Sequence, residues 1–152
     1  MLRGINAITI DGKGRLALPA RYRDEFIARD QSSFVLTIDT EETCLLLYPT
    51  TEWLLIENKL QGLPSFNPMA RRIQRLLIGH ATDVELDGNG RILLTPPLRE
   101  HAQLDKKVVM IGQGNKFEVW NEALWQEKCK QWLIEEAAAK GGLPEEMKSL
   151  SL

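Results

Sequence analysis

The chain has 152 residues, of which 43% are hydrophobic and 26% are charged, and its formal net charge is −2. This length fits one domain or two small ones. The slight negative charge argues against a protein that binds nucleic acid through its overall charge. No run approaches the roughly 18 apolar residues of a membrane span, and the first residues lack the pattern of a signal peptide. We therefore expect a cytoplasmic protein with no membrane partner.

Basic and acidic residues are unevenly distributed along the chain. Residues 1–23 contain five basic residues and one acid, and residues 67–80 contain three arginines and no acid. Residues 118–152 contain seven acids and four lysines. A basic front and an acidic tail are compatible with binding a polyanion through one face, although charged runs are usually solvated surface.

The first predicted elements surround a glycine-containing turn. Residues 8–10 alternate between apolar and polar side chains, which predicts a half-buried strand. Asp11-Gly12 follows and is typical of the tight turn of a β-hairpin, because glycine adopts the positive φ that such a turn needs. The next expected elements are a strand at 15–18, a helix at 20–29 introduced by Pro19, and strands at 34–38 and 44–48.

Two helices are predicted after these strands. The first ends at about residue 61, and Thr50 or Thr51 is placed to cap its start. The second begins at Asn67-Pro68, where asparagine caps the helix and proline takes the first helical position. It ends near Gly79, and its apolar stripe consists of Met69, Ile73, Leu76 and Leu77.

The segment 8–23 recurs later in the chain as segment 84–99. Six of the sixteen aligned pairs are identical: Asp11/Asp87, Gly12/Gly88, Gly14/Gly90, Arg15/Arg91, Leu18/Leu94 and Arg23/Arg99. The match resumes between 47–53 and 119–125, so the second copy is four residues shorter in its middle. Because one copy is too small to hold a core comfortably alone, we expect the two copies to share one core.

The duplication predicts a chain of four parts. These are a first repeat at 5–53, a helical connector at 54–80, a second repeat at 81–125, and a C-terminal helix and tail at 126–152. The later strands are expected at 108–111 and 116–120, the last helix at 121–140 before Gly141-Gly142, and a turn or loose tail at 144–152.

The first turn places two cations within three residues. Lys13 stands at the tip, where an ammonium can meet a phosphate, and the planar guanidinium of Arg15 can meet a phosphate or a guanine edge with two hydrogen bonds. Asp11 is expected to accept backbone N–H bonds within the turn. The alternative is a purely structural turn with solvated charges, and the sequence leaves both open.

Other arginines have two possible roles. Arg21, Arg23 and Arg99 follow the two turns, and they either extend a cationic face or pair with acids such as Asp24 and Glu25. Arg71, Arg72 and Arg75 lie opposite the apolar stripe of their helix, where solvation or a contact between subunits is a simpler interpretation than contact with DNA.

Signals for an enzyme are poor. The glycines of the turn lack the spacing of a phosphate-binding loop, and His80 and His101 have no partner at metal-ligand spacing. Cys44 and Cys129 lie far apart and are expected to be reduced, half-buried thiols. We therefore expect no enzyme, no cofactor, no metal and no small-molecule substrate.

Several stretches together resemble the MraZ family of bacterial transcriptional regulators. They are Arg3-Gly4, the segments 11–23, 44–49 and 71–80, Asp87-Gly-Asn-Gly-Arg91 and Asn115-Lys-Phe-Glu-Val-Trp120. The resemblance implies an α+β, mainly β fold, in which two SpoVT–AbrB-type repeats form an AbrB-like swapped-hairpin β-barrel with peripheral helices. It also implies a ring-shaped homo-oligomer.

The resemblance further implies a nucleoid-associated protein that binds double-stranded DNA. It would bind promoter direct repeats upstream of the division and cell-wall gene cluster, which includes its own gene, usually as a repressor. The family's basic turn faces DNA, and Lys13 and Arg15 match it, with Arg3, Arg21 and Arg91 as further candidates. Asn89 replaces the lysine in the second turn, so the role of that turn stays open. The alternative function is a protein-interaction scaffold whose basic turns bind an acidic partner.

Overall fold

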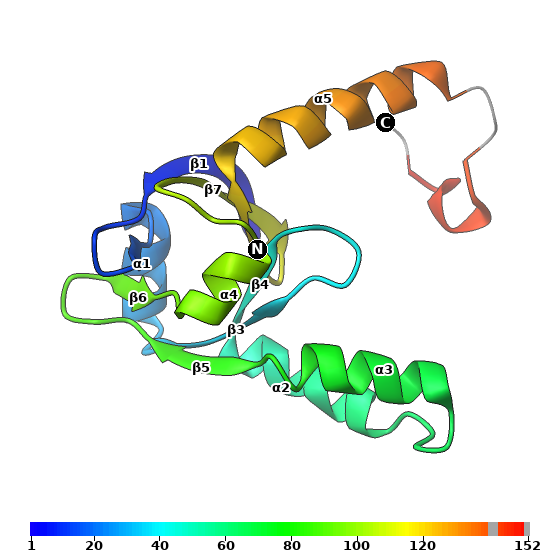
Figure 1. Ribbon diagram of the computed structural model, residues 1–152, viewed down its shortest axis with the longest axis horizontal. Helices are drawn as coiled ribbons and strands as arrows, with labels where there is room; N and C mark the ends of the chain where they lie inside the picture. Colours follow the sequence, from blue (N-terminus) through cyan, green and yellow to red (C-terminus); the bar gives the residue numbers. More distant parts are fainter. Residues whose placement is uncertain (140–142, 151–152) are drawn as a thin grey trace. The chain divides into compact units, whose positions relative to one another are not determined.

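Two repeats supply strands and helices in the same order (Figure 1). The computed structural model describes residues 1–139 and 143–150. The first repeat contains β1 (Leu2–Thr9), β2 (Arg15–Ala17), α1 (Ala20–Ala28), β3 (Ser33–Ile38) and β4 (Leu45–Pro49). Two connecting helices follow, α2 (Thr50–Gln61) and α3 (Pro68–Leu77). The second repeat contains β5 (Thr82–Glu85), β6 (Arg91–Leu93), α4 (Pro96–His101), β7 (Lys107–Gly114) and β8 (Phe117–Asn121).

The order of strands in the main sheet is unchanged when the two repeats are exchanged. Six strands form one antiparallel sheet in the order β1-β7-β8-β4-β3-β5, and β2 pairs separately with β6. Replacing each strand by its counterpart in the other repeat gives the same order read backwards. The duplication seen in the sequence is therefore also a duplication of the pairing pattern.

Each repeat gives its first strand to the other repeat. β1 pairs with β7 from Leu2↔Gly114 to Thr9↔Lys107, and β5 pairs with β3 from Ser33↔Glu85 to Leu36↔Thr82. The predicted hairpin is therefore wrong, because β1 and β2 lie in different sheets. Pairing along the eight residues of β1 satisfies more backbone groups than a hairpin with the three-residue β2 would.

The strands do not close into the barrel that the resemblance implied. Within the described residues, β1 and β5 are the two edges of the six-stranded sheet, and β2 and β6 pair only with each other. No strand pairing therefore joins the two edges. The observed class is α+β with mostly antiparallel strands, as predicted.

The two repeats share one hydrophobic core, as the duplication predicted. Leu16 and Leu18 of the first repeat and Ile92 and Leu94 of the second are all at most 2% exposed and belong to one cluster. Aromatic contacts join distant elements of this cluster: the ring of Tyr22 meets that of Phe117 edge-on, with centroids 4.9 Å apart.

The helix after each turn ends in the same way. Asp30 and Gln103 have φ values of 54° and 53°, and in each repeat the next N–H donates to a carbonyl of the last helical turn. Asp30 and Gln103 are 73 residues apart, whereas Asp11 and Asp87 are 76 apart. Three of the four residues missing from the second repeat are therefore lost between the turn and the end of α4.

The connecting helices agree with the sequence in one cap and differ in the other. Asn67 caps α3, since its side chain accepts hydrogen bonds from the N–H groups of Met69 and Ala70. The prediction that Thr50 or Thr51 caps α2 is wrong: the helix already begins at Thr50, after Pro49, and has no side-chain cap.

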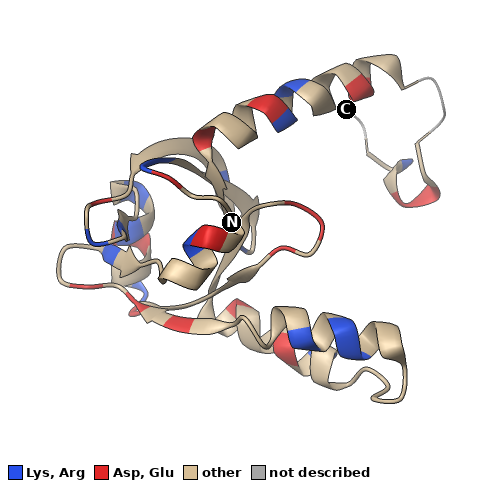
Figure 2. Cartoon of the chain, viewed as in Figure 1, with Lys and Arg blue, Asp and Glu red and all other residues tan. Residues whose placement is uncertain are grey.

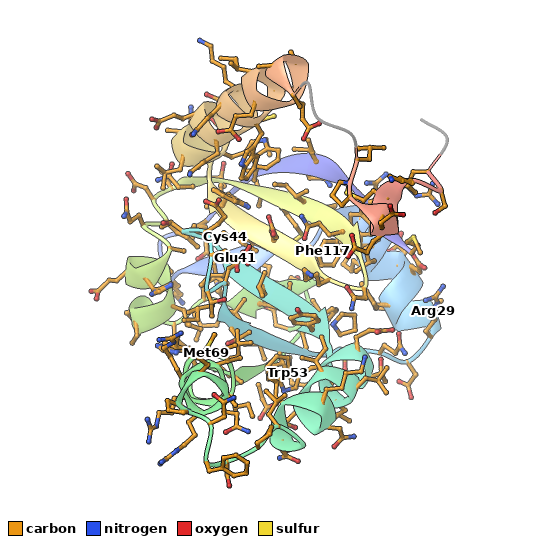
Figure 3. All side chains as sticks on the ribbon, turned by 90° about the vertical axis from the view of Figure 1, so that its right-hand side faces the viewer. Arg29, Glu41, Cys44, Trp53, Met69 and Phe117 are labelled. Atoms are coloured by element: carbon orange, nitrogen blue, oxygen red, sulfur yellow. The ribbon has the colours of Figure 1, made fainter. Side chains whose placement is uncertain are left out.

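The apolar stripe predicted on α3 is only partly used. Leu76 packs against the core, and Thr37 Oγ1 of β3 donates to the carbonyl of Leu77 at 2.7 Å. Met69 is 62% exposed, and Ala70 is the buried residue near the start of the helix. Figure 3 labels Met69 on this helix. Hydrophobic spacing identified the helix correctly but not the side chains that it buries.

The described residues from Ala123 onward form a separate unit. It contains most of α5 (Glu122–Ala138), on which the rings of Trp125 and Trp132 lie 6.1 Å apart, and a short 3₁₀ turn at Glu145–Met147. The predicted stop at Gly141-Gly142 lies outside the described residues. Among the described residues, no helix has the length and apolar character needed to span a membrane.

Candidate nucleic-acid interface

The side chain of Asp11 organises the first turn. Its Oδ1 accepts hydrogen bonds from the N–H groups of Lys13 and Arg15, both at 2.9 Å, and its Oδ2 accepts one from Arg15 Nε at 2.7 Å. The pKa of Asp11 is lowered to about 2, chiefly because the backbone N–H of Arg15 stabilises the carboxylate. Asp11 thus has the backbone-binding role that the sequence predicted.

Asp87 organises the second turn in the same way. It accepts hydrogen bonds from the N–H groups of Asn89 at 2.8 Å and Arg91 at 3.0 Å, and from Arg91 Nε at 3.2 Å. The backbone hydrogen bond from Arg91 is also the main reason why the pKa of Asp87 is lowered. The Asp-Gly-x-Gly-Arg motif therefore specifies one local structure, built twice.

The two turns are joined across the repeats. Antiparallel pairing of β2 with β6 places Arg15 opposite Leu93 and Arg91 opposite Ala17. Arg91 Nη1 lies 3.6 Å from Asp11 Oδ2, so the arginine of the second turn also meets the acid of the first. The two motifs consequently form one surface rather than two separate sites.

The two turn arginines differ in how many acids they face. Arg15 uses Nε for Asp11, and within the described residues its two Nη groups make no hydrogen bond. Arg91 faces both Asp87 and Asp11. The side chains are similarly exposed, at 29% and 28%. The guanidinium of Arg15 is therefore held in place with less of its charge neutralised.

The tips of the turns also differ. Lys13 is exposed, and no acceptor or acid within the described residues contacts its ammonium. Asn89 is exposed at the matching tip of the second turn and carries no charge. The structure thus places Lys13 and Arg15 on one turn and Arg91 beside them on the other. Figure 2 shows where Lys, Arg, Asp and Glu lie along the chain.

Arg3 and Arg21 lie together. Arg21 Nη2 on α1 donates to the backbone carbonyl of Arg3 on β1 at 2.7 Å and to the hydroxyl of Tyr22. The Arg21 guanidinium carbon also lies 4.4 Å from the centre of the Tyr22 ring. Arg21 therefore does not pair with Asp24 or Glu25, and its contacts fix α1 to β1. The side chain of Arg3 is exposed.

Arg23 and Arg99 pack against the turn of the opposite repeat. Gly14 has a φ of 80°, and a Cβ added to it would lie 3.0 Å from Arg99 Cζ; Gly90 has a φ of 73°, and its Cβ would lie 2.1 Å from Arg23 Cδ. Arg23 also forms a 3.8 Å ion pair with Asp24. This pairing is one of the two roles that the sequence left open for Arg23. No sequence signal paired either arginine with a glycine of the other repeat.

One other cluster has the residue types of a metal site. Ligand atoms of Asp39, Cys44 and Glu118 all lie within 4.8 Å of one another. The Cys44 thiol donates to Asp39 Oδ2 at 3.6 Å, and Glu118 accepts a hydrogen bond from Trp120. Figure 3 labels Cys44 beside Glu41. Burial raises the pKa of Cys44 far above its ordinary value, and the charges of Glu118 and Asp39 raise it further. Cys44 is thus a protonated, fully buried thiol rather than the half-buried one that was expected.

The sequence missed this cluster because Glu118 is distant from the other two residues along the chain. The two histidines are neighbours in space, with ring centroids 6.0 Å apart, and His80 Nδ1 lies 2.7 Å from the carbonyl of Leu76. Within the described residues, neither histidine belongs to a metal-ligand group of three.

The fold and the paired turns define a class of protein: a duplicated α+β protein whose two repeats combine their basic turns on one surface. A family model described as "MraZ protein, putative antitoxin-like" matches residues 1–76 and again residues 77–140. The chain belongs to the MraZ family.

Relatives of this chain are similar over their whole length. It is 68% identical to a protein of Legionella pneumophila (strain Corby), and 53% identical to proteins of Halorhodospira halophila and Coxiella burnetii (strain Dugway 5J108-111). Each match covers 100% of both chains, and each relative is named "Transcriptional regulator MraZ".

Proposed function

We propose that this protein is a sequence-specific DNA-binding transcriptional regulator whose first turn makes the main DNA contacts. The observation that carries the proposal is the arrangement of Arg15 beside Lys13. Asp11 holds Arg15 through the Nε of the arginine. The two Nη groups of Arg15 remain available for two parallel hydrogen bonds to a phosphate or a guanine. The names of the relatives support the same function.

The proposed regulator acts as a ring-shaped homo-oligomer on promoter direct repeats. One subunit has a net charge of −2 and few available cations, so a single contact with DNA is weak. Several subunits present several first turns side by side, and repeated DNA sites engage them together, which multiplies the affinity through effective concentration. The regulator works in the cytoplasm at the nucleoid.

The proposed targets are the direct repeats before the division and cell-wall gene cluster, where the protein represses transcription, including that of its own gene. The interleaving of β1 and β5 between the repeats supports the swapped-hairpin arrangement of SpoVT–AbrB proteins. In such an arrangement the turns stand at the ends of exchanged strands, available to DNA. The proposed roles of Arg3, Arg21 and Arg91 are secondary to those of Lys13 and Arg15.

Capture of genomic fragments by the purified full-length protein, followed by sequencing and footprinting, tests this function. We expect enrichment of a short repeated sequence upstream of a gene cluster, and protection of each repeat. An acidic-partner scaffold would protect no sequence. Fragments without a shared sequence would therefore contradict the proposal.

A further inference from the structure

The guanidinium of Arg99 lies beside the first turn, although Arg99 belongs to the second repeat. It packs on the backbone at Gly14, and its Nε is buried without a hydrogen-bond partner. Within the described residues no acid pairs with it, whereas its counterpart Arg23 pairs with Asp24. A buried cationic donor without an acceptor is costly unless a ligand supplies one.

Arg99 borders a pocket beside this turn. The other residues that line the pocket are Ile10, Asp11, Gly12, Leu104, Asp105 and Lys106. Lys106 is exposed, and its backbone carbonyl accepts a hydrogen bond from the N–H of Ile10, which fixes this loop next to the turn. Asp11 already faces Arg15 and Arg91, so Asp105 is the remaining acid against two cations.

The equivalent position beside the second turn has the opposite charge. The hydrogen bond from Leu86 N–H to the Ser32 carbonyl matches the one from Ile10 to Lys106, so Ser32 is the counterpart of Lys106. The hydroxyls of Ser32 and Ser33 donate to Glu85, whose counterpart in the first repeat is Thr9. The second position thus has two hydroxyls and a carboxylate where the first has two lysines, Lys106 and Lys107, and a threonine.

We propose that the pocket between Arg99 and Lys106 binds one phosphate of the DNA backbone, next to the bases or phosphates that Lys13 and Arg15 contact. This inference rests on the proposed function and adds a residue set from the second repeat to the interface of the first turn. It would also favour the first of two nearly identical turns for the main DNA contact: a polyanion meets cations beside the first turn and Glu85 beside the second.

The salt dependence of DNA binding tests the pocket. Fluorescence anisotropy titrations at several KCl concentrations compare the full-length protein with Lys106→Ala, Arg99→Gln and the matched control Arg23→Gln. Each is measured on a duplex recovered in the genomic capture and on a random-sequence duplex. The logarithm of the binding constant falls linearly as the logarithm of the salt concentration rises. Losing one phosphate contact per bound subunit makes this fall less steep, by about 1 in the slope for each such subunit. We expect this change for Lys106→Ala and Arg99→Gln on both duplexes, and an unchanged slope for Arg23→Gln.

Two results would overturn the pocket while leaving the proposed function standing. One is a wild-type slope for Lys106→Ala on a duplex that wild type binds specifically. Because Lys106 is exposed, its substitution should not disturb the fold, so this test holds even if Arg99→Gln fails to fold. The other is an equal loss of slope for Arg23→Gln, which would remove the asymmetry between the turns. If wild type binds neither duplex, the proposed function itself fails.

Discussion

Gly14 and Arg99 belong to different repeats and pack directly against each other. Gly14 is buried with a φ of 80°, and an added Cβ would lie 3.0 Å from Arg99 Cζ. The Gly14 carbonyl also accepts a hydrogen bond from the N–H of Leu94 at 2.9 Å. The first turn is therefore fixed by the second repeat. Gly14 is needed both for its positive φ and for its close packing against Arg99.

Gly14→Ala should destabilise the fold, whereas Gly12→Ala should have little effect. A non-glycine residue in the left-handed region costs about 1–2 kcal/mol, and the methyl group at position 14 must also displace Arg99. No atom lies within 4 Å of a Cβ added at Gly12. Urea unfolding of both variants checks this, and equal midpoints would show that Gly14 is not held as described.

The shared core predicts that buried and exposed side chains of β2 and β6 contribute very differently to stability. Leu16 and Ile92 face each other across this ladder and are at most 1% exposed, whereas Leu93, one position further, is 51% exposed. Leu16→Ala or Ile92→Ala should each cost about 2–5 kcal/mol of unfolding free energy. Leu93→Ala should change it by no more than about 0.5 kcal/mol. A large loss at Leu93 in denaturant unfolding would mean that this surface is covered.

The Asp11 carboxylate predicts a loss of stability in acid. Its pKa is about 2 in the folded protein and near 3.8 in an unconstrained chain, so the charged turn stabilises the fold above pH 4. That stabilisation disappears as the pH falls from about 4 to 2. Asp11→Asn should therefore flatten the dependence of unfolding free energy on pH in this range. Parallel curves for wild type and Asp11→Asn would contradict the hydrogen-bond pattern of the turn.

The two cysteines should differ in reactivity. Cys44 is 0% exposed, and burial keeps its thiol protonated at neutral pH, whereas Cys129 is partly exposed. A thiol reagent should label Cys129 in the native protein and both residues after denaturation. Mass spectrometry of the labelled peptides reads this directly, and rapid native labelling of Cys44 would show that its strand opens.

Much of the fold could be predicted because it is written in local patterns. The strands expected at 15–18, 34–38, 44–48, 108–111 and 116–120 lie within a few residues of observed strands, and Asn67-Pro68 located the start of α3. The strand that alternation predicted at 8–10 begins earlier, at Leu2. The choice of strand partners could not be predicted this way. Asp11-Gly12 does form a turn, but β1 then pairs with β7, because a long-range ladder offers more hydrogen bonds than the local hairpin. A local motif such as Asp11-Gly12 does not show how many hydrogen bonds a distant strand would offer instead of the local hairpin.

The site was predictable in its motif and unpredictable in its surroundings. The repeated acid and arginine identified both turns, and Lys13 against Asn89 showed which turn has more charge. The contacts of Arg91 with Asp11 and of Arg99 with Gly14 cross between repeats, so spacing along the chain could not reveal them. The same limit hid the meeting of Glu118 with Asp39 and Cys44.

The central claim is that the first turn makes the main DNA contacts and that the tip of the second turn makes none. A gel-shift titration of a captured repeat-containing fragment with Lys13→Ala and Asn89→Ala tests it most directly, because both tips are exposed and uninvolved in side-chain contacts that hold the turns. Arg15→Ala, with the oligomer checked by size-exclusion chromatography, extends the test to the second contact. We predict weaker binding for Lys13→Ala, loss of specific binding for Arg15→Ala, and wild-type binding for Asn89→Ala. Wild-type affinity for both Lys13→Ala and Arg15→Ala would contradict the claim.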